Sequence, residues 1–164
     1  MIDKMIVNRL NDYFIVANNH IEMINKAIEF IKPYYPFDSN FKEEIKEDVL
    51  LFALDSLVFR FSKLQDWLGQ KIFKTFLAYE EYPIEDISFF DVLKTLEKEN
   101  ILNVDVWAVF REIRNELAHD YPNYDEIADN LNFIIDNSGD LIEISKKLER
   151  EFNKLKKKKN EINK

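Results

Sequence analysis

The chain has 164 residues, a mass of 19.7 kDa and a formal net charge of -8 at pH 7, a size typical of one domain. The chain has only two Gly and four Pro, which disfavours β-sandwiches, β-barrels and Gly-rich phosphate loops. It has no Cys, which excludes disulfides, thiolate metal sites and a Cys nucleophile. Hydrophobic residues make up 46% of the chain, which predicts a folded core. The sequence contains no apolar run long enough to predict a membrane span, and its first residues do not resemble a signal peptide. We therefore expect a cytoplasmic protein.

Charge is spread unevenly along the chain. Residues 146–164 hold nine Lys or Arg and three Glu, whereas the other residues hold 14 bases and 28 acids. An acidic body repels phosphates, so any nucleic-acid function requires a local cationic site. We expect residues 1–155 to form one helical domain and residues 156–164 to form a basic C-terminal tail at a solvated, fraying helix end.

Apolar residues recur at steps of three and four along most of the chain, which predicts helices. The first helix is expected over residues 3–31, because Pro33 and Pro36 follow it. The last is expected to begin after a cap formed by Asn123 with Glu126 and to be weakened locally by a glycine at position 139.

A second long helix is expected to start near Phe41 and to end before Tyr82 and Pro83. Its middle, residues 49–61, is apolar on nearly every side. Such a helix lies at the centre of a bundle, or between a bundle and a partner. Gly69 within it is typical of a weak point or of a close helix crossing.

Two shorter helices are expected between these long ones. Ser88 with Asp91 predicts an N-terminal cap before a helix over residues 89–100, and Asn103 predicts a cap before a helix over 104–119. The residues expected to be buried in the second of these are Val106, Val109, Phe110, Ile113 and Leu117. Together the helices predict an all-α fold, an antiparallel bundle of four to five helices.

One segment, residues 111–122, combines side chains that suit phosphate chemistry. Arg114 is permanently charged and its forked donors fit phosphate oxygens, while His119 suits proton transfer near neutral pH. The pair is the minimum set for metal-free cleavage of RNA: the imidazole moves the 2′-OH or leaving-group proton, and the guanidinium stabilises charge on the phosphate oxygens. The two lie about 140° apart on an ideal helix, so the last turn must distort or a second copy must contribute.

Arg111 lies one turn before Arg114 on nearly the same face, so it either extends a phosphate site or pairs with surface carboxylates. We expect Trp67 and Trp107 to belong to the core rather than to a base-stacking platform. His20, in the first helix, is expected at the surface or as a satisfied core residue.

Arg114, Asn115, His119 and Tyr121 match the R-[polar]-x-x-x-H-x-Y signature position by position. In this the chain resembles HEPN domains, and within them the HepT-like toxins, described as nucleotidyltransferase substrate-binding proteins. The resemblance implies a HEPN-like helical bundle that dimerises so that the motifs of two chains face one cleft. It also implies a metal-independent endoribonuclease of a toxin–antitoxin pair that needs no cofactor.

The same resemblance implies residue roles and partners. Arg114 and His119 would be catalytic, with Asn115 supporting them, and Tyr121 would be the site where a minimal nucleotidyltransferase antitoxin attaches AMP and silences the toxin. The expected partners are thus a second copy of the chain, RNA and the nucleotidyltransferase, and no membrane. The alternative is a non-catalytic HEPN binding module that serves the nucleotidyltransferase and is AMPylated on Tyr121.

Other interpretations of the same residues involve metals or no chemistry at all. Glu116 and His119 match half of a di-iron carboxylate site, but the second half needs a Glu where Ala17 precedes His20. His119 followed by Asp120 resembles metal phosphohydrolases, which need more His than this chain has. His119 alone also suits a helix C-terminus, as in a purely structural bundle. We expect no metal.

Overall fold

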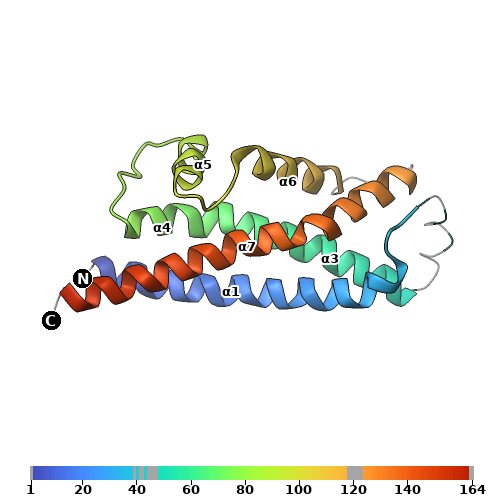
Figure 1. Cartoon of the computed structure of the whole chain (residues 1–164), viewed down its shortest axis with the longest axis horizontal. Helices are drawn as coiled ribbons and strands as arrows, with labels where there is room; N and C mark the ends of the chain where they lie inside the picture. Colours follow the sequence, from blue (N-terminus) through green and yellow to red (C-terminus); the bar gives the residue numbers. More distant parts are fainter. Residues whose placement is uncertain (1, 39, 41–42, 44–47, 118–123, 163–164) are drawn as a thin grey trace.

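The computed structural model describes residues 2–38, 40, 43, 48–117 and 124–162 (Figure 1). Its elements are α1 (Ile2–Ile31), the 3-10 turn η1 (Lys32–Tyr34), α3 (Asp48–Trp67), the π-helical segment η2 (Leu68–Ile72), α4 (Phe73–Tyr79), α5 (Phe89–Lys98), α6 (Val104–Leu117) and α7 (Tyr124–Ile162). The prediction of an all-α fold is confirmed for this part of the chain. None of these helices is both long and apolar enough to cross a membrane.

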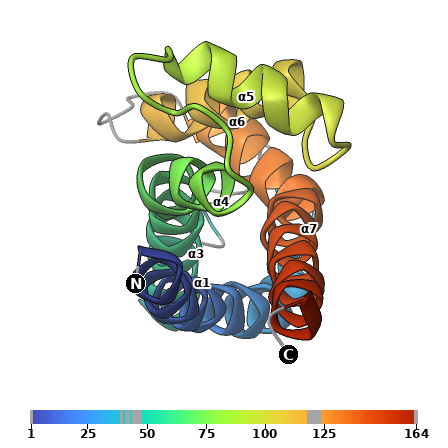
Figure 2. The same cartoon turned by 90° about the vertical axis from the view of Figure 1, so that its left-hand side faces the viewer.

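The long helices run alternately up and down. α1 is antiparallel to the rod formed by α3, η2 and α4, α6 returns along that rod, and α7 lies beside α1 (Figures 1 and 2). The end of α7 therefore meets the start of α1, where the Lys159 ammonium lies 3.6 Å from the Asp3 carboxylate. The same ammonium donates to the backbone oxygen of Tyr79 at the end of α4, at 3.0 Å. The predicted antiparallel bundle is confirmed, with α5 as a short additional helix packed on α4 and α6.

Aromatic rings join α6 to the rest of the bundle. The rings of Phe61 and Phe110 pack edge to face with centroids 5.7 Å apart, and those of Phe73 and Trp107 lie 4.9 Å apart. Trp107 is almost wholly buried, which confirms its expected place in the core. Burial of such rings fixes the position of α6 against α3 and α4.

Local caps define the short helices as predicted. The Ser88 hydroxyl accepts from the backbone N–H of Asp91 at 3.1 Å, and the Asp91 carboxylate accepts from the Ser88 N–H at 3.2 Å. The Asn103 side chain accepts from the N–H of Val106 at 3.0 Å at the start of α6. α5 ends at Lys98, earlier than predicted, because Asn100 takes a left-handed backbone with φ of 58°.

The second long helix shows one local irregularity. Its expected start near Phe41 lies outside the described residues, and its ordinary helical geometry is interrupted around Gly69 by η2. A Cβ added at Gly69 would meet the rings of Phe89 and Trp107 at 3.4 Å. Gly69 thus lies against side chains of α5 and α6 and also within a local departure from α-helical geometry, so both expected roles of this glycine stay open.

α7 is the longest helix and passes through Gly139 without a break. Its expected cap involves Asn123, which lies outside the described residues, as does the side chain of Glu126. Residues 156–162 of the expected basic tail continue α7, and Lys159 is held there by Asp3, Glu81 and the ring of Tyr79.

Several apolar side chains of α6 and α3 lie outside the core. Val106 and Val109 on α6 are 39% and 40% exposed, so the prediction that they are buried was wrong: Trp107 and Phe110 take the positions that face the bundle.

On α3, the prediction that apolar residues lie on several sides of the helix holds. Its outer side, which we call the α3 apolar face, consists of Val49, Phe52 and Phe59.

Candidate functional site

The structure describes part of the predicted catalytic motif. Arg114 and Asn115 lie in the last turn of α6, which ends at Leu117. His119 and Tyr121 lie outside the described residues. The geometry of the site therefore concerns Arg111, Arg114 and Asn115, together with the side chains that meet them from α3 and η2.

Arg114 is held on both sides. Its Nη1 donates to the carboxylate of Asp66 on α3, and its Nη2 donates to the side-chain oxygen of Asn115 at 2.8 Å. The side chain of Arg114 remains 23% exposed, so solvent reaches it. A guanidinium has five N–H donors, so further donors remain for another anion while its orientation is restrained. Asn115 is thus hydrogen-bonded to Arg114, and its role in catalysis stays a prediction.

Arg114 borders a cleft between α3 and α6 with a volume of about 500 Å³. The residues of this α3–α6 cleft that bear on its chemistry are Gln65, Asp66, Lys74, Phe89, Trp107, Arg111 and Arg114. Its volume falls in the range of small-molecule sites. Arg111 and Arg114 line the same cleft, which confirms that their spacing places them on one face of α6.

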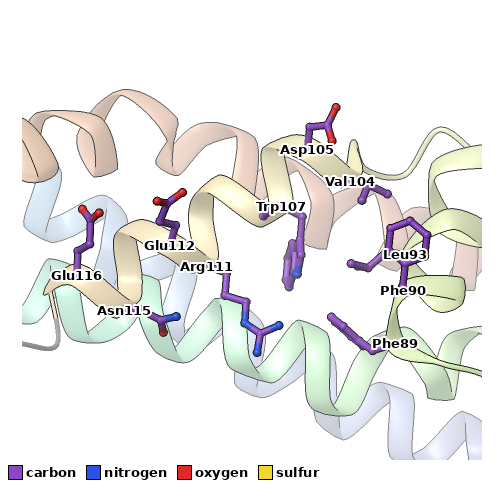
Figure 3. Close-up of a pocket in the computed structure, with 11 residues that line it drawn as sticks. Phe89, Phe90, Leu93, Val104, Asp105, Trp107, Arg111, Glu112, Asn115 and Glu116 are labelled. Carbon is purple, nitrogen blue, oxygen red and sulfur yellow. The ribbon is translucent and has the colours of Figure 1, made fainter.

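The cleft is cationic although the chain is acidic. Asp66 is paired with Arg114, whereas Lys74 and Arg111 have no ion-pair partner among the described residues. Figure 3 shows Arg111 pointing from α6 toward α3, while Glu112 lies on the opposite side of α6. The unpaired positive charges therefore favour an anionic ligand.

Gln65 lies in this cleft and was not identified from the sequence. It is only 2% exposed, and neither polar atom of its amide has a hydrogen-bond partner in the described structure. A buried polar group without a partner costs about 1–3 kcal/mol. The sequence does contain an indication of this residue. Gln65 occupies a core-facing position of the helical repeat, next to Leu64 and Leu68, where an apolar residue is expected.

Two further depressions adjoin the cleft. One of about 770 Å³ shares Phe89, Trp107 and Arg111 with it but is rimmed by Glu112 and Glu116, which disfavour phosphate there (Figure 3). The other, of about 480 Å³, lies on the far side of Arg114. We call it the outer depression, and among its lining residues are Phe59, Lys63, Asp66, Arg114 and Asn115. Arg114 is therefore accessible from both the cleft and the outer depression.

The other predicted candidates have structural roles. The Trp67 indole N–H donates to the backbone oxygen of Tyr13 at 2.9 Å. The Nδ1 atom of His20 lies 3.2 Å from Nη1 of Arg60, and burial, followed by the positive charge of Arg60, lowers the pKa of His20. His20 is thus a partnered, half-buried residue, between the surface and core positions expected for it.

No group of three or more His, Cys, Asp or Glu side chains in the described ranges is arranged to hold a metal ion. No protein-family model, no curated protein and no solved structure matches the chain. The resemblance to HEPN domains therefore stays a prediction that rests on the sequence motif.

Proposed function

We propose that the chain is a HEPN-like, metal-independent endoribonuclease of a toxin–antitoxin system, which cleaves RNA as a homodimer. The observation that carries this proposal is the placement of Arg114. In the sequence, Arg114 and His119 have the spacing of the motif. Asp66 and Asn115 orient the Arg114 side chain, which borders a cleft whose unpaired charges are positive. An oriented guanidinium at such a place suits a phosphodiester.

The proposed reaction is an internal transesterification. The 2′-oxygen of RNA attacks the neighbouring phosphorus while its proton passes to an imidazole, and the bond from phosphorus to the 5′-oxygen breaks as that oxygen takes a proton. A homodimer has two copies of His119, so one acts as base and the other as acid. Arg114 stabilises the charge on the non-bridging oxygens. The products are a 2′,3′-cyclic phosphate and a 5′-hydroxyl.

The α3 apolar face supports the dimer in this proposal. Phe52 and Phe59 are 66% and 51% exposed, and exposed aromatic side chains on one face of a helix favour a protein partner. Phe59 belongs both to this face and to the outer depression, which also contains Arg114. A second copy docked on the α3 apolar face would therefore approach Arg114, as a shared catalytic cleft requires.

Incubation of the purified protein with RNA in the presence of EDTA tests the proposal. The wild type is expected to cleave, and His119→Ala and Arg114→Ala each to lose at least about 100-fold in rate. The matched controls are His20→Gln and Arg150→Ala; Arg150 is paired with Glu143 on α7, away from the cleft. Wild-type protein without activity, or activity that survives both motif substitutions, would contradict the proposal.

A second function is a non-catalytic HEPN module that serves a nucleotidyltransferase. This function is favoured by the ion pair between Arg114 and Asp66, because the Asp66 carboxylate already offsets the positive charge of Arg114 that would bind a substrate phosphate. This function predicts transfer of AMP to Tyr121 by a nucleotidyltransferase encoded beside this chain, with no RNA cleavage. Mass spectrometry after incubation with that enzyme and ATP detects the adenylate, and Tyr121→Phe is the control that must lack it.

A further inference from the structure

The amide of Gln65 is the starting observation. Gln65 lines the α3–α6 cleft, is almost wholly buried, and both polar atoms of its side chain lack partners in the described structure. Buried amides are nearly always hydrogen-bonded in native proteins. An amide that is buried, unpaired and beside an open cleft is therefore suited to a ligand that offers both a donor and an acceptor.

The charges of the cleft restrict the ligand further. Lys74 from α4 and Arg111 from α6 line it without ion-pair partners among the described residues, and the Asp66 carboxylate is paired with Arg114. The ligand thus combines a hydrogen-bonding edge with negative charge. One aromatic ring is available as well: the half-buried ring of Phe89 lies in the cleft near Arg111 (Figure 3). An unstacked RNA base with its phosphates has all three properties.

We propose that the α3–α6 cleft is a base-recognition subsite that binds one unstacked adenine of the RNA. Gln65 pairs with the adenine edge, because a side-chain amide matches the adjacent donor and acceptor of adenine. Lys74 and Arg111 bind the adjoining phosphates. The inference rests on the proposed function for RNA as the ligand, and it adds Gln65 as the residue that determines which base is selected.

Binding of non-cleavable RNA tests this directly. Fluorescence anisotropy with 2′-O-methyl oligonucleotides of A, C, G or U measures base preference in the full-length protein whether or not it cuts RNA. The wild type is expected to bind oligo-A about tenfold more tightly than the others. Gln65→Leu is expected to abolish the preference, and it removes the unpaired amide, so the variant should stay folded. Gln65→Glu is expected to shift the preference toward C.

A lysine pair provides the matched control for the phosphate contacts. Lys74→Gln is expected to weaken binding of all four oligonucleotides alike, because a phosphate contact carries no base information. Lys71→Gln is expected to leave binding unchanged, because Lys71 is exposed and does not line the cleft. Each substitution removes one positive charge, and the two lysines lie in neighbouring turns. A difference in RNA binding between the two variants therefore reports whether the lysine lines the cleft, and not the loss of charge itself.

The outcomes separate this inference from the proposed function. Equal binding of the four oligonucleotides by the wild type, absence of binding, or an oligo-A preference that survives Gln65→Leu overturns the subsite. Adenine preference in a protein that cleaves no RNA supports the subsite and contradicts the nuclease. Cleavage with the same cut sites in wild type and Gln65→Leu supports the nuclease and contradicts the subsite.

Discussion

The carboxylate of Asp66 on α3 accepts a hydrogen bond from the guanidinium of Arg114 on α6. This pair joins the two helices at the edge of the α3–α6 cleft and belongs equally to the outer depression. It has two opposite effects on a bound phosphate: it orients the guanidinium, and it brings a negative charge close to the anion. Asp66 is therefore a positioning residue in the proposed nuclease.

Replacement of Asp66 separates these two effects. Asp66→Asn keeps the shape but removes the charge, so KM for RNA is expected to fall, because one repulsive carboxylate is gone. The value of kcat is expected to fall about tenfold, because Arg114 is less firmly oriented. Steady-state kinetics on a short RNA measure both. Asp55→Asn, exposed on the same helix, is the control, and a parallel change in both variants would contradict the positioning role.

The pH dependence of stability is expected to depend on Glu80. Burial, followed by the negative charges of Glu99 and Glu151, raises the pKa of Glu80 from 4.5 to about 8. The folded state holds a proton that the unfolded chain releases, so this contribution to stability is complete below the unfolded pKa and is lost as pH rises through about 8.

Glu80→Gln removes that titration. The Tm of the variant is expected to decline less than that of the wild type between about pH 5 and about pH 8.5, as scanning calorimetry would measure. Glu85→Gln, an exposed carboxylate on the loop after α4, is the control. Identical curves for wild type and Glu80→Gln would exclude Glu80 as the source of the pH dependence.

The α3 apolar face predicts the behaviour of a charged substitution. Phe52 is 66% exposed in the single chain, so Phe52→Glu is expected to leave the monomer fold intact while converting the dimer to monomer. Sedimentation velocity at micromolar concentration measures this. Ile15→Glu, on α1 and 60% exposed, is the control and should remain dimeric. Wild-type protein that sediments as a monomer would contradict the proposed homodimer.

Helix capping gives a prediction about stability alone. Ser88→Ala removes the side chain that accepts from the N–H of Asp91 and is expected to reduce the free energy of unfolding by about 1 kcal/mol. Urea denaturation measures the change. Ser56→Ala, within α3, does not remove an N-cap and is expected to change stability by less than about 0.5 kcal/mol. Equal losses in both variants would argue against the cap.

The positions of the helices were largely predictable because their ends are set locally. Pro33 after α1, the Ser88–Asp91 box and the Asn103 cap act within a few residues and are visible in the sequence. Which apolar residues become buried is not local. Val109 has the spacing of a core residue, but Phe110 fills the position facing α3 and α7, so Val109 is left outside.

The candidate site was predictable in part for the same reason. The shared face of Arg111 and Arg114 follows from their spacing on one helix, and both line the cleft. Asp66 precedes Arg114 by 48 positions, so their pairing depends on how α3 crosses α6 and not on a sequence pattern. The isolation of the Gln65 amide likewise depends on what surrounds it in the folded bundle.

The chemical structure of the RNA product ends distinguishes the proposed transesterification from other cleavage reactions. A defined RNA is incubated in EDTA with the wild type and with Arg114→Ala, and the termini are identified by mass spectrometry. We predict a 2′,3′-cyclic phosphate and a 5′-hydroxyl with the wild type, and intact RNA with Arg114→Ala. Intact RNA with the wild type, or fragments bearing 5′-phosphates, would contradict cleavage by Arg114 and His119.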